Sequence, residues 1–96
     1  MNRYNDISLK DAIGAFLRDY GLREKYLQAT VQSRWSEIMG QTIAKHTNDV
    51  YVSGKTLTVF IDSSTLKHEM NQSKDKIIDL VNTAIGEAVI EQVYIR

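Results

Sequence analysis

The chain has 96 residues, of which 43% are hydrophobic and 25% are charged. This length is sufficient for one compact domain, and the composition excludes a wholly disordered chain. The 12 lysines and arginines equal the 12 aspartates and glutamates in number, which argues against a histone-like binder that relies on excess positive charge. Cysteine is absent, and this excludes disulfides, thiol catalysis and thiolate metal sites.

The location of the chain is predicted from its hydropathy. No apolar run approaches the ~20 residues that span a bilayer, and the first residues do not resemble a signal peptide. We therefore predict a single domain over residues 1–96 in the cytoplasm, without membrane contact. Residues 1–7 are expected to form a flexible N-terminus.

The first predicted helix begins after Ser8, because Ser8 followed by Asp11 resembles a capping box. Gly21 stands where a left-handed residue ends such a helix. Gly14 lies inside it, costs ~1 kcal/mol relative to alanine, and is attributed to a close packing contact. The spacing of i, i+3 and i+4 predicts one apolar stripe, which comprises Leu9, Ala12, Ile13, Phe16, Leu17 and Tyr20.

A second helix is predicted over residues 23–39, where Gly40 ends it, and residues 41–46 continue with one or two helical turns after a kink. The period then changes from helical spacing to alternation. Residues 49–62 alternate apolar and polar side chains around a reversal at residues 53–55, which predicts a β-hairpin.

The remaining residues predict a helix and a last strand. A helix capped by Ser63 or Ser64 extends to Gly86, either as one long helix or as two with a break at residues 71–73. Alternation over residues 88–95 predicts the strand. Because a strand–helix–strand connection is nearly always a right-handed crossover, this strand should lie parallel to residues 56–62. The prediction is an α+β fold, α-α-β-β-α-β, with a small three-stranded mixed sheet packed against helices on one face.

The inventory of reactive residues argues against an enzyme. His46 and His68 have no partner at the usual zinc spacing. The chain has no nucleophile elbow, phosphate-binding glycine loop or dinucleotide motif. We therefore predict a protein without catalytic residues, metal or cofactor.

The order of elements is that of a type II KH domain, and such domains hold single strands with a Gly-x-x-Gly loop between two helices. The corresponding segment here is 71–74, Asn-Gln-Ser-Lys, which has no glycine. A backbone without glycine approaches phosphate less closely. The candidate phosphate contacts, which could equally be solvated surface side chains, are Lys45, Lys55, Lys67 and Lys74, with Arg96 in addition.

The aromatic residues fall into two groups. Trp35 lies in the apolar stripe of the second helix, which predicts a core position. Tyr51, Phe60 and Tyr94 alternate out of phase with the apolar strand residues, so we expect them on the sheet face away from the helices. Such a patch could stack bases, bind a partner protein or form a homodimer interface.

Residues 35–47 read Trp-Ser-Glu-Ile-Met-Gly-Gln-Thr-Ile-Ala-Lys-His-Thr. Over residues 35–69 the chain resembles the DciA-like family, whose signature is Trp-x-x-x-x-Gly-x-x-Ile-Ala-x-His-Thr. The hairpin with Gly54, Leu57 and Val59 and the Ser63-Ser64 helix start follow in the family's order. The signature residues are interpreted as mainly structural: they are Trp35, Gly40, Ile43, His46 and Thr47.

The resemblance implies a KH-like domain in a bacterial, non-enzymatic accessory protein that engages the replicative helicase, with weak binding of single- or double-stranded DNA. Larger members carry a flexible, often basic region beyond the domain, whereas this chain ends at Arg96. The alternative is a protein–protein interaction or homodimerisation module without nucleic-acid binding. Lysines clustered on one face would favour the first hypothesis, and exposed aromatic residues without nearby lysines would favour the second.

Overall fold

The computed structural model describes residues 8–19 and 21–96. The predicted flexible N-terminus and Tyr20 of the first apolar stripe lie outside these residues. The helices and strands of the described residues, in chain order, are α1 (Leu9–Asp19), α2 (Arg23–Ser33), α3 (Trp35–Met39), α4 (Gln41–Lys45), β1 (Thr47–Ser53), β2 (Thr56–Ile61), α5 (Ser64–Asn71), α6 (Lys74–Ile85) and β3 (Gln92–Ile95).

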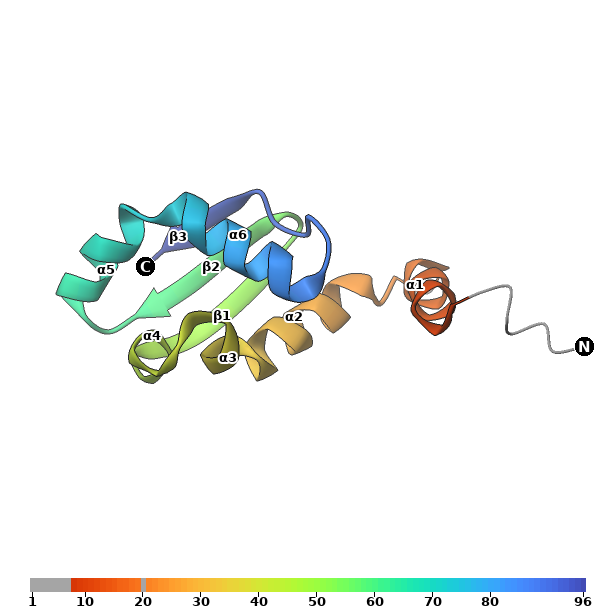
Figure 1. Ribbon diagram of the computed structural model, residues 1–96, viewed down its shortest axis with the longest axis horizontal. Coiled ribbons are helices and arrows are strands. Elements are labelled where there is room, and N and C mark those ends of the chain that lie inside the picture. The colour runs from red at the N-terminus through yellow and green to blue at the C-terminus, as the bar shows by residue number, and fades with distance from the viewer. Residues whose placement is uncertain (1–7, 20) are drawn as a thin grey trace, which may run out of the picture.

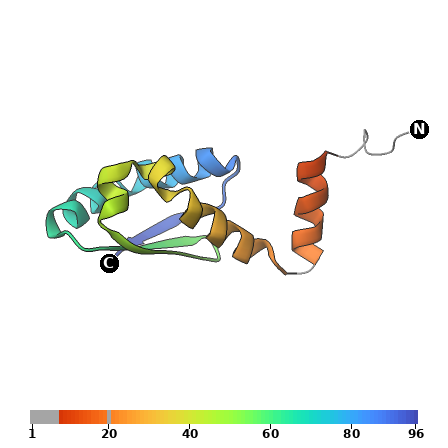
Figure 2. The ribbon, with the colours of Figure 1, turned by 90° about the horizontal axis from the view of Figure 1, so that it is seen from below.

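The three strands form one mixed sheet in the order β1-β2-β3. β1 and β2 pair antiparallel, with Val50 opposite Val59, and β3 pairs parallel to β2, with Val93 opposite Leu57. Figure 2 shows the helices on one side of this sheet, while the other face is open. The predicted α+β fold and the parallel last strand are confirmed.

The core lies between the sheet and the helices. Alternate strand residues point inward, because side chains of a strand alternate between its two faces, and Leu57 and Val59 are fully buried. The opposite wall comes from the helices, and its buried side chains include Leu27, Val31, Trp35, Met70, Ile77 and Val81. Leu80, one of the apolar positions of α6, is 40% exposed and lies outside this core.

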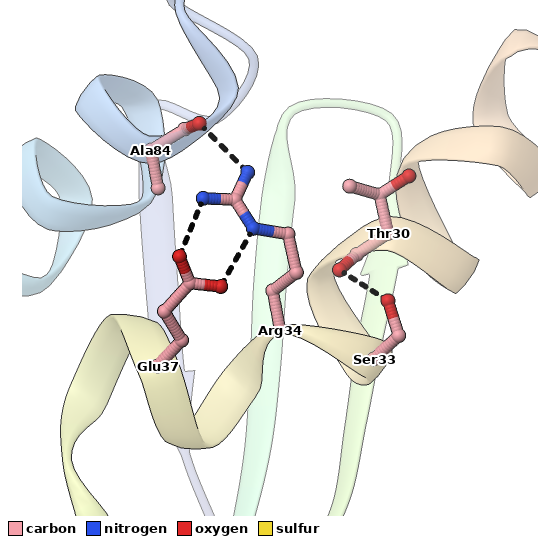
Figure 3. A network of polar contacts seen from close by, with 5 residues as sticks. All are labelled: Thr30, Ser33, Arg34, Glu37 and Ala84. Carbon is pink, nitrogen blue, oxygen red and sulfur yellow. Dashed lines mark hydrogen bonds and ion pairs between the residues drawn. The ribbon is translucent and has the colours of Figure 1, made fainter.

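The second predicted helix is divided at Arg34 into α2 and α3 (Figure 3). The guanidinium of Arg34 donates from Nε and Nη2 to the two carboxylate oxygens of Glu37, at 3.0 and 3.2 Å, and from Nη1 to the carbonyl of Ala84 at 3.0 Å. The bond to Arg34 lowers the pKa of the Glu37 carboxyl. Arg34 thereby connects the α2–α3 junction to the last turn of α6.

The connection from β2 to β3 contains two helices. Ser63 caps α5 by accepting a hydrogen bond from the Leu66 N–H at 3.2 Å, and the break at residues 72–73 separates α5 from α6. β3 is shorter than the predicted 88–95, because the amides of Val89 and Ile90 donate to the Asn82 side chain and not to the β2 ladder.

α1 has the predicted caps but a different environment. Ser8 Oγ accepts a hydrogen bond from the Asp11 N–H at 3.0 Å, and Gly21 has φ +66°. The helix stands apart from the other elements (Figure 1), so its apolar stripe is largely exposed. The close contact expected at Gly14 is wrong, because a Cβ there would meet only the Arg18 guanidinium, at 3.5 Å.

A polar row on α2 covers the free edge of β1. Gln28 donates to the carbonyl of Val50 at 2.7 Å and accepts from the Val52 N–H. The row continues at four-residue spacing, which places side chains on one helix face, with bonds from Gln32 to Val50 at 3.0 Å and from the Gly54 N–H to Glu24 at 2.9 Å. Backbone groups that would otherwise attract another strand are thus paired.

The hairpin turn provides the first testable prediction. Gly54 has φ +59°, and a Cβ there would meet no atom within 4 Å, so substitution strains the backbone without any clash. We expect Gly54→Val to lower the free energy of unfolding by about 2 kcal/mol, measured by urea denaturation. Gly54→Asn should cost clearly less, because asparagine tolerates the left-handed region. An unchanged stability of the valine variant would contradict this account of the turn.

Candidate nucleic-acid interface

The open face of the sheet carries three aromatic side chains. Tyr51, Phe60 and Tyr94 are 53%, 38% and 47% exposed, on the face that their alternation predicted. Thr58 pairs with Tyr51 on one side and Tyr94 on the other, so the two tyrosines belong to one row across the three strands, and Phe60 lies two residues further along β2. We call these three side chains the aromatic face. That it forms an interface stays a prediction.

Two cations lie beside Tyr94. Lys74 Nζ is 5.9 Å and Arg96 Cζ is 6.0 Å from the centroid of the Tyr94 ring, within the range of cation–π attraction. The backbone of Arg96 continues the ladder, since its N–H donates to Val59 at 2.8 Å and its carbonyl accepts from Ile61 at 2.9 Å. Positive charge is therefore held at the edge of the aromatic face.

The predicted phosphate contacts divide between the two ends of the sheet. Lys45 ends α4 immediately before β1, and Lys67 lies in α5, immediately after β2. β1 and β2 are antiparallel, so these segments meet at one end, where Lys74 also stands beside Tyr94. Lys45 is exposed, whereas Lys67 and Lys74 are partly buried. Lys55 lies in the hairpin turn at the other end, where its ammonium contacts Glu91 at 3.2 Å.

The α5–α6 junction contains residues 71–74, the predicted counterpart of the Gly-x-x-Gly loop. Its residues Asn71, Gln72 and Ser73 are exposed, and Asn71 donates to the carbonyl of Lys67 at 3.0 Å. Lys74, the first residue of α6, extends from this junction to Tyr94. The junction and the aromatic face are therefore contiguous.

The signature residues lie in and around the core. Trp35 is 5% exposed and donates from its indole N–H to Thr47 Oγ1 at 3.0 Å, and Thr47 donates in turn to the carbonyl of Ile43 at 2.6 Å. Gly40 takes φ +88° between α3 and α4. His46 follows α4, and its Nδ1 lies 2.9 Å from an Asp62 carboxylate oxygen. These contacts connect α3, α4 and the start of the sheet.

The described residues contain no group of three or more histidine, cysteine, aspartate or glutamate side chains that could hold a metal ion. His68 lies 3.3 Å from the side-chain amide of Gln72. No helix within the described part of the chain has the length and apolar character needed to cross a membrane.

The fold and the exposed face define a class of protein: a small α+β domain whose open sheet face carries aromatic side chains beside cations. The chain matches the family model described as Dna[CI] antecedent, DciA, over residues 8–95, and it belongs to the DciA family. This is a family of helicase-loading accessory factors of bacterial DNA replication and not a family of enzymes. No curated protein matches the chain.

Proposed function

We propose that this domain is a helicase-loading accessory module that engages the replicative helicase and binds single-stranded DNA on its aromatic face. The observation that carries the DNA proposal is the contiguity of Tyr94 with Lys74 and Arg96. Bases of a single strand stack on exposed aromatic rings while nearby cations contact the phosphates. A replication factor acts on the chromosome, so we propose the cytoplasm as its location.

The same geometry predicts that DNA binding is weak and depends on few charges. Lys45, Lys67 and Lys74 lie at one end of the sheet with Arg96, and Lys55 lies at the other. Each phosphate neutralised on a single strand adds about −0.7 to the slope of log K against log salt. Four cations therefore predict a slope of about −2 to −3.

The test is a fluorescence-anisotropy titration of labelled single- and double-stranded DNA at several salt concentrations. Replacing Lys45, Lys67 and Lys74 together with glutamine should reduce the slope to about −1, because only Arg96 remains. Tyr51→Ala and Tyr94→Ala should weaken single-strand binding about tenfold each at an unchanged slope, since stacking carries no charge. Lys55→Gln is the matched control and should bind as the wild type does.

Two outcomes would contradict the DNA proposal. Absence of binding to either form of DNA at low salt would remove it altogether. If Lys55→Gln and single substitutions at the other end of the sheet reduce the affinity for DNA equally, the DNA is attracted diffusely to the whole protein surface. Helicase engagement is tested separately, by capture of the replicative helicase from a native lysate on the immobilised domain, with mass spectrometry as the readout.

A protein-only function is the second candidate. Phe60 offers no hydrogen-bonding group and is 38% exposed beside two tyrosines, and aromatic residues are enriched in protein interfaces. In this case the aromatic face binds a partner protein or a second copy of the chain. Loss of helicase capture by Phe60→Ala and Tyr94→Ala, without any DNA binding by the wild type, would favour it.

A further inference from the structure

The helix α1 presents an apolar surface that the rest of the domain leaves open. Leu9 and Ile13 are 78% and 45% exposed. α1 has 11 residues, and helices shorter than ~12–15 residues are marginally stable in water on their own. An amphipathic helix of this length is normally stabilised by packing of its apolar face, and here α2 provides that packing only in part.

α1 and α2 enclose a groove, which we call the α1 groove. Figures 1 and 2 show α1 at the opposite end of the molecule from the C-terminus. The groove has a volume of about 580 Å³, and Ile85 of α6 contributes to its wall. The other apolar side chains that line it are Leu9, Ile13, Leu17, Tyr26 and Leu27. On the α1 wall the apolar side chains recur every four residues, at positions 9, 13 and 17, and Tyr26 and Leu27 face them from α2. An apolar groove along a helix is typical of a site that accepts another helix.

Gly14 lines the α1 groove and has no packing partner within the described residues that would explain it. A Cβ at Gly14 would meet only the end of the Arg18 side chain. Glycine is unfavourable inside a helix, and a position without a side chain lets another backbone approach closely. The space at Gly14 therefore suits a helix that is not part of this chain's fold.

The charges around the α1 groove are predominantly positive. Four basic residues line it against two acidic ones, the basic residues being Lys10, Arg18, Arg23 and Arg34. Arg23 pairs with Glu87, and Arg34 pairs with Glu37 outside the groove. No ion pair of Lys10 or Arg18 is found among the described residues. The hydrogen bond from Arg23 holds the pKa of the Glu87 carboxyl below its ordinary value, and the charges of Lys10 and Arg18 act in the same direction.

We propose that the α1 groove binds an amphipathic α-helix of a partner protein, with its apolar stripe between α1 and α2 and acidic side chains against Lys10 and Arg18. The backbone of the bound helix passes over Gly14. The site is separate from the aromatic face. It does not depend on which protein supplies the helix, so it stands apart from the function proposed above.

The probe is a synthetic fluorescein-labelled peptide of about 18 residues, with leucines at i, i+3, i+4 and i+7 spacing and glutamates on both flanks. Binding to the whole chain is followed by fluorescence anisotropy. We expect saturable binding of this peptide, and binding at least tenfold weaker for a second peptide with lysine in place of every glutamate.

Two kinds of variant test the site. The double charge reversal Lys10→Glu with Arg18→Glu should weaken binding of the acidic peptide about tenfold, because the complementary charges become repulsive. Lys25→Glu with Lys76→Glu changes the net charge equally outside the groove, and it should leave the affinity unchanged. Gly14→Leu should abolish binding by filling the groove, while circular dichroism shows equal or greater helix content, because leucine favours helix.

Three results would overturn the proposal: equal affinity for the acidic and basic peptides, wild-type affinity of Gly14→Leu, or equal losses in the two charge-reversal variants. Light scattering coupled to size-exclusion chromatography tests the competing occupant. If the wild type is a dimer and Gly14→Leu is a monomer, a second copy of the chain occupies the α1 groove, which also overturns the proposal.

Discussion

Replacing Trp35 with alanine is expected to lower the free energy of unfolding by about 4 kcal/mol. The indole is 5% exposed within the core, and its N–H donates to Thr47 Oγ1 at 3.0 Å. The substitution leaves a cavity between α3 and the sheet and removes that hydrogen bond. Because domains of this size are stable by roughly 5–15 kcal/mol, urea denaturation followed by circular dichroism should show a large shift of the midpoint.

Trp35→Phe separates the two contributions. Phenylalanine retains much of the apolar volume but no N–H, so we expect a smaller loss, of about 1–2 kcal/mol. The chain has one tryptophan, and its native fluorescence should be blue-shifted and move to longer wavelength on unfolding. A red-shifted native spectrum combined with near wild-type stability of Trp35→Ala would place the residue at the surface and contradict the prediction.

The second large effect is expected at Asn82 in α6. Its side-chain oxygen accepts hydrogen bonds from the Val89 and Ile90 amides at 2.9 and 3.0 Å, and its Nδ2 donates to the Ile90 carbonyl at 3.0 Å. Val89 and Ile90 are 5% and 1% exposed, so the loop before β3 is buried without ladder hydrogen bonds. Asn82→Ala removes the partner of the Ile90 N–H and carbonyl, which should cost about 3 kcal/mol. The Val89 N–H keeps a second acceptor, the carbonyl of Glu87 at 2.9 Å.

The measurement is urea denaturation together with amide hydrogen exchange at Val89 and Ile90. In Asn82→Ala both amides should exchange faster relative to global unfolding, since the local structure of the loop is lost. Asn82→Asp retains the hydrogen-bond acceptor and loses the donor, so it should lower the free energy of unfolding about half as much as Asn82→Ala does. Thr83→Ala, an exposed neighbour, should change stability by no more than about 0.5 kcal/mol. Unchanged protection of both amides in the alanine variant would contradict the assigned role.

The candidate DNA interface was predictable in its aromatic part. Alternation along β1, β2 and β3 places Tyr51, Phe60 and Tyr94 on the face opposite the valines, because the period of a strand is two. The cations beside Tyr94 were only partly predictable. Arg96 follows Tyr94 by two positions, a spacing that places both on one face, but Lys74 arrives from a helix 20 positions earlier in the sequence. Only the packing of α6 against β3 brings it there.

The α1 groove shows where periodicity is insufficient. The stripe of α1 correctly predicts an amphipathic helix, and Ser8 and Gly21 correctly predict its ends. Periodicity reports that one face of a helix is apolar, but not what covers it. In the folded domain the core is closed by α2, α3, α5 and α6, so α1 remains beside it with Ile13 45% exposed.

By itself the sequence determined the properties that depend on neighbouring residues. These are the caps of α1 and α5, the reversal at Gly54, the alternation of the strands and the burial of Trp35. They follow from backbone conformation and from hydrophobic periodicity, both of which act over a few positions.

The tertiary structure alone decided the contacts that join distant segments. Gln28 pairs with the edge of β1, Arg34 divides a helix while binding the end of α6, and Asn82 ends the ladder of β3. Each is a polar side chain whose partner is a backbone group of another segment. The partners of Gln28 and Arg34 lie 22 and 50 positions away, and those of Asn82 lie seven and eight positions away across the α6–β3 loop. A buried backbone group must find a hydrogen bond, but which side chain supplies it depends on how the helices pack on the sheet.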